Sequence, residues 1–260
     1  MQRRVLRPTR FAVVYDIDGP RIRLGAAWFV LLAGAFVVGM GALSVLYAAA
    51  AALAGYQAAT AWRQREQWPN RWAAGLAAGA IALAGLGGSA AVGLAVLGAL
   101  PVILIVSAAD RRVHGVIGSV GLTIQCSLFV GLAGASALLA WDVDFGAAIV
   151  LVALVCAYEV GDFVVGSGST NSLEGPIAGM AAIGVVTFAL WAINMSPFED
   201  DALIGFGGLA AALAPVGQLL ASAVLPAADA RAPALRRLDT LLVLGPVWAI
   251  AARLYVDGLS

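Results

Sequence analysis

Lysine is missing from this 260-residue chain, histidine occurs once and cysteine occurs twice. The sequence therefore contains no Walker phosphate loop and no zinc motif built from histidine and cysteine, and it also has no nucleophile elbow. Charged residues make up only 12% of the chain and the net charge is zero, so nothing favours binding to a nucleic acid. The two cysteines lie within apolar runs, where we expect inert core residues.

Apolar residues are abundant instead, at 62% of the chain, whereas about half is usual in a soluble domain. The stretch 24–62 is 39 residues without a charge, about 58 Å as one helix and nearly twice the hydrocarbon core of a bilayer. It must turn back, and we predict the turn near 39–41; a second break is predicted at 85–89. The expected fold is an all-α integral membrane bundle of about nine transmembrane helices. Two spans lie in 24–62 and two in 72–109, and the others are 113–140, 147–165, 176–193, 202–225 and 238–256.

All fifteen basic residues are arginines, and fourteen of them lie in four short stretches between the apolar runs. Since arginine-rich loops stay in the cytoplasm, this pattern predicts a cytoplasmic N-terminus in the plasma membrane, with Arg253 as the exception. The basic segment 1–23 is expected to precede a single transmembrane domain, 24–257. It runs straight into a span of full length, so we do not expect a cleavable signal peptide.

Glu159 and Asp162 are three residues apart and therefore share one face of a helix near its cytoplasmic end. Two carboxylates placed in this way can hold a divalent cation. The alternative is a pair of interfacial acids that reach water or pair with an arginine.

The segment 166–175 is rich in glycine and hydroxyl side chains and precedes a helix, an arrangement that suits a phosphate group. Asn171 and Glu174 alternatively form a capping box that needs no ligand. Further along, Gln218 and Ser222 lie one turn apart and either contact a ligand or hydrogen-bond between helices.

Four segments in this order resemble the phosphatidate cytidylyltransferase (CDP-diacylglycerol synthase) family. Residues 159–166 resemble the family's Asp-x-x-Ala-Tyr-x-x-Gly, and 170–175 resemble its Lys-Lys-Thr-Trp-Glu-Gly without either lysine. Residues 217–222 are similar to Gly-Asp-Leu-x-x-Ser with Gln218 for the aspartate, and 236–239 to Asp-Arg-x-Asp with Arg236 for the first aspartate. The family's Lys-Asp pair and its glycine loop, which lie between these last two segments, have no counterpart other than Asp229 and Arg231.

The resemblance implies a site within 158–239 that joins CTP to a lipid phosphate such as phosphatidate, with Mg²⁺ as cofactor. It implies catalytic roles for Glu159 and Asp239 and metal ligation by Glu159, Asp162 and Asp239. The phosphate-binding residues that it implies are Gly166, Ser169, Ser172, Glu174, Ser222, Arg236 and Arg237.

Because the missing residues weaken the expectation of activity, a catalytically inactive pseudoenzyme is the alternative. It would be a lipid-binding or scaffolding subunit, in a complex with another membrane protein or as a homodimer. A transporter is disfavoured, since no charged residue lies deep within any predicted span.

Overall fold

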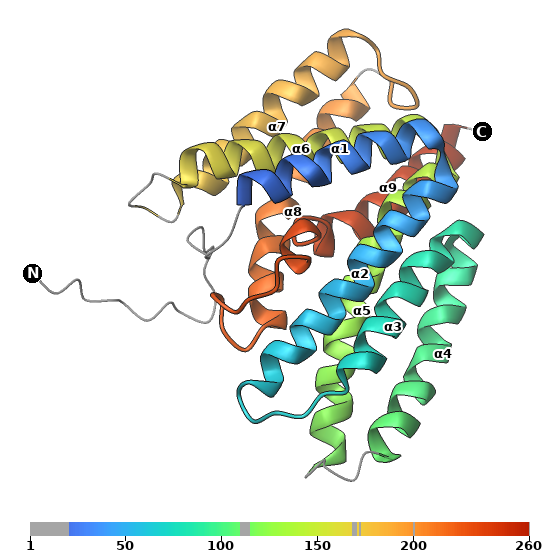
Figure 1. Cartoon of the computed structure of the whole chain (residues 1–260). Coiled ribbons are helices and arrows are strands. Elements are labelled where there is room, and N and C mark those ends of the chain that lie inside the picture. Colours follow the sequence, from blue (N-terminus) through green and yellow to red (C-terminus); the bar gives the residue numbers. More distant parts are fainter. Residues whose placement is uncertain (1–20, 110–114, 168–170, 172, 200, 260) are drawn as a thin grey trace, which may run out of the picture.

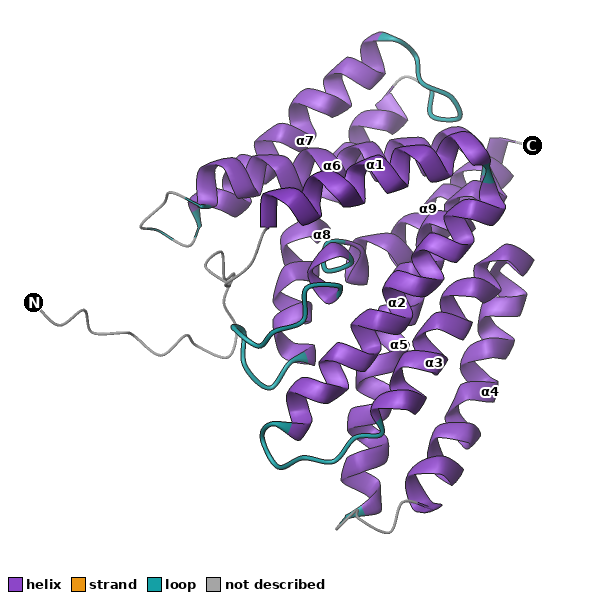
Figure 2. Cartoon of the chain, viewed as in Figure 1, coloured by secondary structure: helices purple, strands orange, loops and turns teal. Residues whose placement is uncertain are grey.

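A computed structural model describes residues 21–109, 115–167, 171, 173–199 and 201–259 of the chain. Within these ranges the fold is entirely helical (Figures 1 and 2). The α-helices are α1 (Arg21–Val38), α2 (Met40–Arg63), α3 (Arg71–Leu83), α4 (Gly88–Ala109), α5 (Val116–Val143), α6 (Phe145–Gly166), α7 (Glu174–Ala192), α8 (Asp201–Val224) and α9 (Leu241–Leu259). Two short 3₁₀ helices, η1 (Ala84–Gly87) and η2 (Leu235–Arg237), precede α4 and α9.

Seven helical segments of the described chain are long and apolar enough to cross a membrane, one of them being α3, η1 and α4 taken together. The apolar part of α1, Leu24–Val38, is shorter. The chain is therefore a multi-pass helical membrane protein. Some boundaries differ from those predicted: the helix expected at 113–140 is Val116–Val143, and the one expected at 238–256 is Leu241–Leu259.

Glycines make both of the sharp turns that the sequence predicts. Gly39, with φ of 118°, separates α1 from α2, and Gly88, with φ of 74°, separates η1 from the rest of α4. Only glycine adopts such angles without steric cost, which is why the long apolar runs turn at these two points.

The helices run in two main directions (Figure 1). Helices α2, α3, α4 and α5 run along one direction, while α1 and α6 cross it in the view of Figure 1. The largest contact surfaces are those of α2 with α3, α6 with α7, and α3 with α5, and α9 packs against α5.

Small residues bring these helices close together, as expected from the high glycine content. A Cβ added to Gly55 of α2 would lie 2.8 Å from the Ala74 carbonyl oxygen of α3, and one added to Gly161 of α6 would lie 2.7 Å from that of Ala178 in α7. Backbones are therefore nearly in contact across both pairs.

The end of α8 and the connection that follows it pack against α2 and α5. The Trp62 indole N–H donates to the Val224 carbonyl at 2.7 Å, and the Gln125 amide donates to that of Ala223 at 2.9 Å. The Ala234 backbone N–H in turn donates to Oε1 of Gln57 at 3.0 Å. The first two bonds hold the last turn of α8 against α2 and α5, and the third holds the α8–α9 connection against α2.

Candidate functional site: a carboxylate–arginine cluster

Polar side chains from α6, α8 and the α8–α9 connection meet at the end of the bundle where α6 and α8 end and α9 begins. We call this group the carboxylate–arginine cluster; it consists of Tyr158, Glu159, Asp162, Gln218, Arg236, Arg237 and Asp239. The sequence predicted five of these as site residues, and the structure brings those five together although they span 81 positions of the chain, counting from 159 to 239.

The two acids of α6 differ in their surroundings. Asp162 is 5% exposed, whereas Glu159 is half-buried. Glu159 interacts electrostatically with Asp239, Arg237 and Asp162. The sequence pattern that placed both acids on one face of a helix is thus confirmed, and both face the α8–α9 connection.

Gln218 links α8 to α6 through two hydrogen bonds. The Tyr158 hydroxyl donates to its Oε1 at 3.0 Å, and its Nε2 donates to Oδ2 of Asp162 at 2.9 Å. Gln218 is only 6% exposed, so these bonds satisfy polar groups that are shielded from water. Of the two roles considered for Gln218, the hydrogen bond between helices is confirmed.

Asp239 lies two residues before α9 and is held by its neighbours. Its Oδ1 accepts from the Thr240 backbone N–H at 2.8 Å, and its Oδ2 lies 3.8 Å from Nη1 of Arg236. Burial raises the pKa of Asp239 to about 6, against the lowering effects of Arg236 and of the Thr240 hydrogen bond; the Asp162 carboxylate raises it further. Burial therefore outweighs the nearby arginine, a balance typical of functional sites.

Arg236 is fixed at both sides of its guanidinium group. Nη2 donates to the Ala228 carbonyl at 2.6 Å, while Nη1 faces Asp239. The third nitrogen, Nε, is buried and has no hydrogen-bond partner among the described residues. A buried N–H without a partner is costly, so Arg236 is held here against an unfavourable contribution to stability.

Arg237 reaches the cluster from the side of α1. A Cβ added to Gly25 of α1 would lie 3.4 Å from Nη1 of Arg237, so the Arg237 guanidinium packs directly on the α1 backbone. Its charge acts on both Glu159 and Asp239. The two arginines thus flank the carboxylates from different directions.

A glycine in α8 permits this close assembly. A Cβ added to Gly217 would contact the Asp239 carbonyl oxygen and would lie 2.8 Å from that of Thr240. Any side chain at 217 would push α8 away from the residue that carries the carboxylate.

The glycine-rich segment is only partly described. Gly166 is the buried last residue of α6 and Glu174 the exposed first residue of α7, while Ser169 and Ser172 lie outside the described residues. The expected capping box differs from what is found. A capping box would have the Asn171 side chain accept from the Glu174 N–H. Because α7 begins only at Glu174, the Asn171 side chain accepts from the Leu173 N–H instead, at 3.2 Å.

Ser222 is fully buried one turn beyond Gln218, and its hydroxyl donates to the Gln218 carbonyl at 3.2 Å. This bond lies within α8. Its predicted contact with a phosphate stays a prediction.

A metal site with three protein ligands is not assembled in the described residues: no three His, Cys, Asp or Glu side chains lie close enough to hold one ion. The acids have protein partners instead: Asp162 accepts from Gln218, and Asp239 from Thr240, with Arg236 nearby. Carboxylate oxygens suit Mg²⁺ chemically, but these do not converge on one point.

Tyr158 is the cluster residue that the sequence did not single out. It is fully buried one helical turn before Asp162, and its ring packs on Gly179 of α7. A tyrosine four residues from an acid on an apolar helix is the signal that could have indicated it, since a buried hydroxyl needs a hydrogen-bond partner.

The fold and the cluster together define a multi-pass helical membrane protein with a shielded site that carries both signs of charge. Comparison with known protein families, with curated proteins and with solved structures found no match.

Proposed function

We propose that this protein binds the phosphate group of a membrane lipid at the carboxylate–arginine cluster. The observation that carries the proposal is Arg236, a nearly buried guanidinium whose Nε has no partner among the described residues and which lies beside Arg237 at the bundle end. Two arginines in this position can bind phosphate through charge-assisted hydrogen bonds, and a phosphatidate headgroup has the matching charge. This proposal corresponds to the pseudoenzyme alternative: a catalytically inactive, lipid-binding protein that resembles the cytidylyltransferase family.

Cytidylyl transfer from CTP to the lipid phosphate is the second candidate. It is favoured by the electrostatic interaction of Glu159, Asp162 and Asp239, the three acids to which the resemblance assigns Mg²⁺. The acids as arranged among the described residues do not form a three-ligand site. Binding of a lipid phosphate is common to both candidates.

The proposed topology has nine spans and a cytoplasmic N-terminus, with the cluster on the cytoplasmic side of the plasma membrane. It is supported by the arginines of the α2–α3 and α8–α9 connections and by the acids Asp142 and Asp144, which lie between α5 and α6 at their other ends. Cysteine labelling of single-cysteine variants at 65 and 231, from outside intact cells, tests it. Labelling at either position without permeabilisation would contradict the assignment.

Phosphatidate binding is tested by native mass spectrometry of the detergent-purified full chain. We expect Arg236→Gln to weaken binding about tenfold or more, since a hydrogen bond to a charged group contributes about 1.5–3 kcal/mol. Arg65→Gln is the control, because it removes the same charge from an exposed position beyond the end of α2. Equal affinity in the two variants would contradict the proposal.

The second candidate has its own assay, turnover of CTP and phosphatidate with Mg²⁺. If it holds, we expect turnover in the unmodified protein and none in Glu159→Gln or Asp239→Asn. Binding without turnover would leave the lipid-binding function alone.

A further inference from the structure

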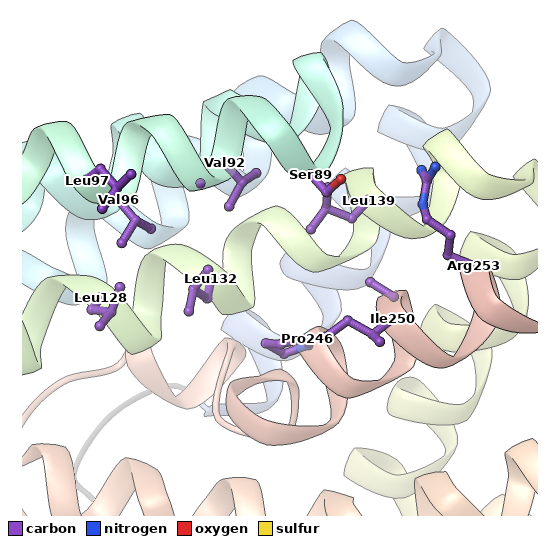
Figure 3. A pocket seen from close by; sticks show the side chains of 12 residues that line it. Ser89, Val92, Val96, Leu97, Leu128, Leu132, Leu139, Pro246, Ile250 and Arg253 are labelled. Carbon is purple, nitrogen blue, oxygen red and sulfur yellow. The ribbon is translucent and has the colours of Figure 1, made fainter.

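An apolar groove lies between α4, α5 and α9, and none of the cluster residues lines it (Figure 3). Its volume is about 620 Å³, within the roughly 300–1,000 Å³ typical of ligand sites. Its walls include Val92 and Val96 of α4, Leu128 and Leu132 of α5, and Pro246 and Ile250 of α9. A groove of this size and composition accepts a hydrocarbon chain.

One end of the groove is charged. Arg253 of α9 lies there, whereas Leu97 and Leu128 lie toward the other end (Figure 3). The Arg253 guanidinium donates to Oδ2 of Asp142. The same carboxylate packs against Gly88 at the start of α4, since a Cβ added to Gly88 would lie 3.1 Å from Oδ2. Since the side chain of Arg253 is 41% exposed and arginine has five N–H donors, it can bind a further anion beside Asp142.

The outer face of α4, the helix that forms one wall of the groove, is apolar. Leu94, Leu97 and Ile105 of α4 are each about two-thirds exposed, as expected of side chains that face lipid. An apolar groove with an arginine at one end is complementary to one kind of molecule of the bilayer, a lipid with an acyl chain and a headgroup phosphate.

We propose that this groove binds one acyl chain of an anionic glycerophospholipid, with the headgroup phosphate at Arg253. The site is separate from the cluster. Leu241 and Arg253 are twelve residues apart on α9, about 18 Å along the helix axis, so the two sites lie toward opposite ends of that helix.

Photolabelling of the full chain tests this site. The protein is placed in phosphatidylcholine nanodiscs that contain phosphatidylglycerol with a diazirine in its acyl chain, and the labelled residues are mapped by mass spectrometry. We expect labels on the groove walls of α4, α5 and α9. Arg253→Gln should lower the preference of the groove for the phosphatidylglycerol probe over a matched phosphatidylcholine probe by about tenfold.

Two glycines of α4 give a matched pair of variants. Gly93 lines the groove and Gly98 does not, and a Cβ at either meets nothing within 4 Å. Gly93→Phe fills the groove and should lower its labelling at least about tenfold, while Gly98→Phe should leave it unchanged. If Gly93→Phe does not fold, Gly93→Leu gives the same comparison with a smaller side chain.

Undiminished labelling in the Gly93 variants, or equal loss in Gly98→Phe, would overturn the proposal. A dimer that Gly93→Phe converts to a monomer, with no labelled groove in the unmodified protein, would also overturn it and assign the groove to a second copy of the chain. Arg236→Gln separates the two sites, because it should weaken phosphatidate binding and leave groove labelling unchanged.

Discussion

Two arginine–aspartate pairs lie near opposite ends of α9, and they differ in nearly every physical respect. Arg236 and Asp239 are 13% and 8% exposed and stand 3.8 Å apart, whereas Arg253 and Asp142 are 41% and 38% exposed and hydrogen-bonded. The buried pair has the poorer geometry and lies among other acids. The exposed pair therefore contributes little to stability, as surface ion pairs usually do, while the buried pair is maintained at a cost in stability, as functional sites commonly are.

The pH dependence of stability gives the largest expected effect. The pKa of Asp239 is raised from 3.8 to about 6 in the fold, mainly by burial, so the folded state binds its proton more tightly than the unfolded state does. Folding is therefore favoured below about pH 4, and this contribution is lost as the pH rises to 6. At about 1.4 kcal/mol per pKa unit, the change is on the order of 3 kcal/mol. Thermal unfolding in detergent between pH 4 and 7 measures it.

Asp239→Asn is the control for that slope. It keeps the acceptor for the Thr240 N–H and removes the buried charge, so we expect a smaller slope and a higher melting temperature at pH 7. A variant whose slope equals that of the unmodified protein would assign the pH dependence to other groups.

Gly217→Ala should destabilise the fold by about 1–3 kcal/mol, because its methyl group would overpack against the backbone of Asp239 and Thr240. Gly208→Ala is the matched variant in α8, since a Cβ there meets nothing within 4 Å. Chemical unfolding of both in the same detergent measures the difference. Equal stabilities would mean that α8 and the connection pack less closely than described.

Gln218→Leu tests the bridge between α6 and α8. The substitution leaves the Tyr158 hydroxyl and the Asp162 carboxylate without their amide partner, and we expect a loss of about 1–2 kcal/mol in unfolding free energy. Gln218→Glu keeps the acceptor for Tyr158 but sets a second acid against Asp162, so its loss should grow as the pH rises. A loss independent of pH in both variants would argue against a direct contact with Asp162.

Asp142→Asn gives the smallest expected effect. The pair with Arg253 is partly exposed, and such pairs contribute about 0–1 kcal/mol. A loss as large as that of Gln218→Leu, measured by the same unfolding experiment, would remove the contrast between the two ends of α9.

Much of the fold followed from local features of the sequence. The turn at Gly39 and the break before Gly88 were both predicted, since uninterrupted apolar runs are too long for one span and glycine is the residue that turns them. The start of α9 was predicted three residues early, because the hydropathy of Leu238 does not reveal that η2 and the buried Asp239 precede the helix.

The candidate site was predictable only as a set of residues. Glu159 and Asp162 could be placed on one face from their spacing alone. The bond of Asp162 to Gln218 crosses 56 positions, and the sequence left open whether Gln218 binds a ligand or another helix. The capping box was misplaced for a related reason: competition between two N–H groups for the Asn171 side chain depends on where α7 begins.

The sequence by itself determined that this protein crosses a membrane, roughly where its helices lie and which polar residues stand near their ends, because hydrophobic length and glycine turns act locally along the chain. Only the tertiary structure decided how those polar residues pair, since Tyr158, Gln218, Arg236 and Asp239 meet through the packing of α6, α8 and the connection before α9. It also formed the groove beside Arg253, whose walls come from three helices that the sequence does not place together.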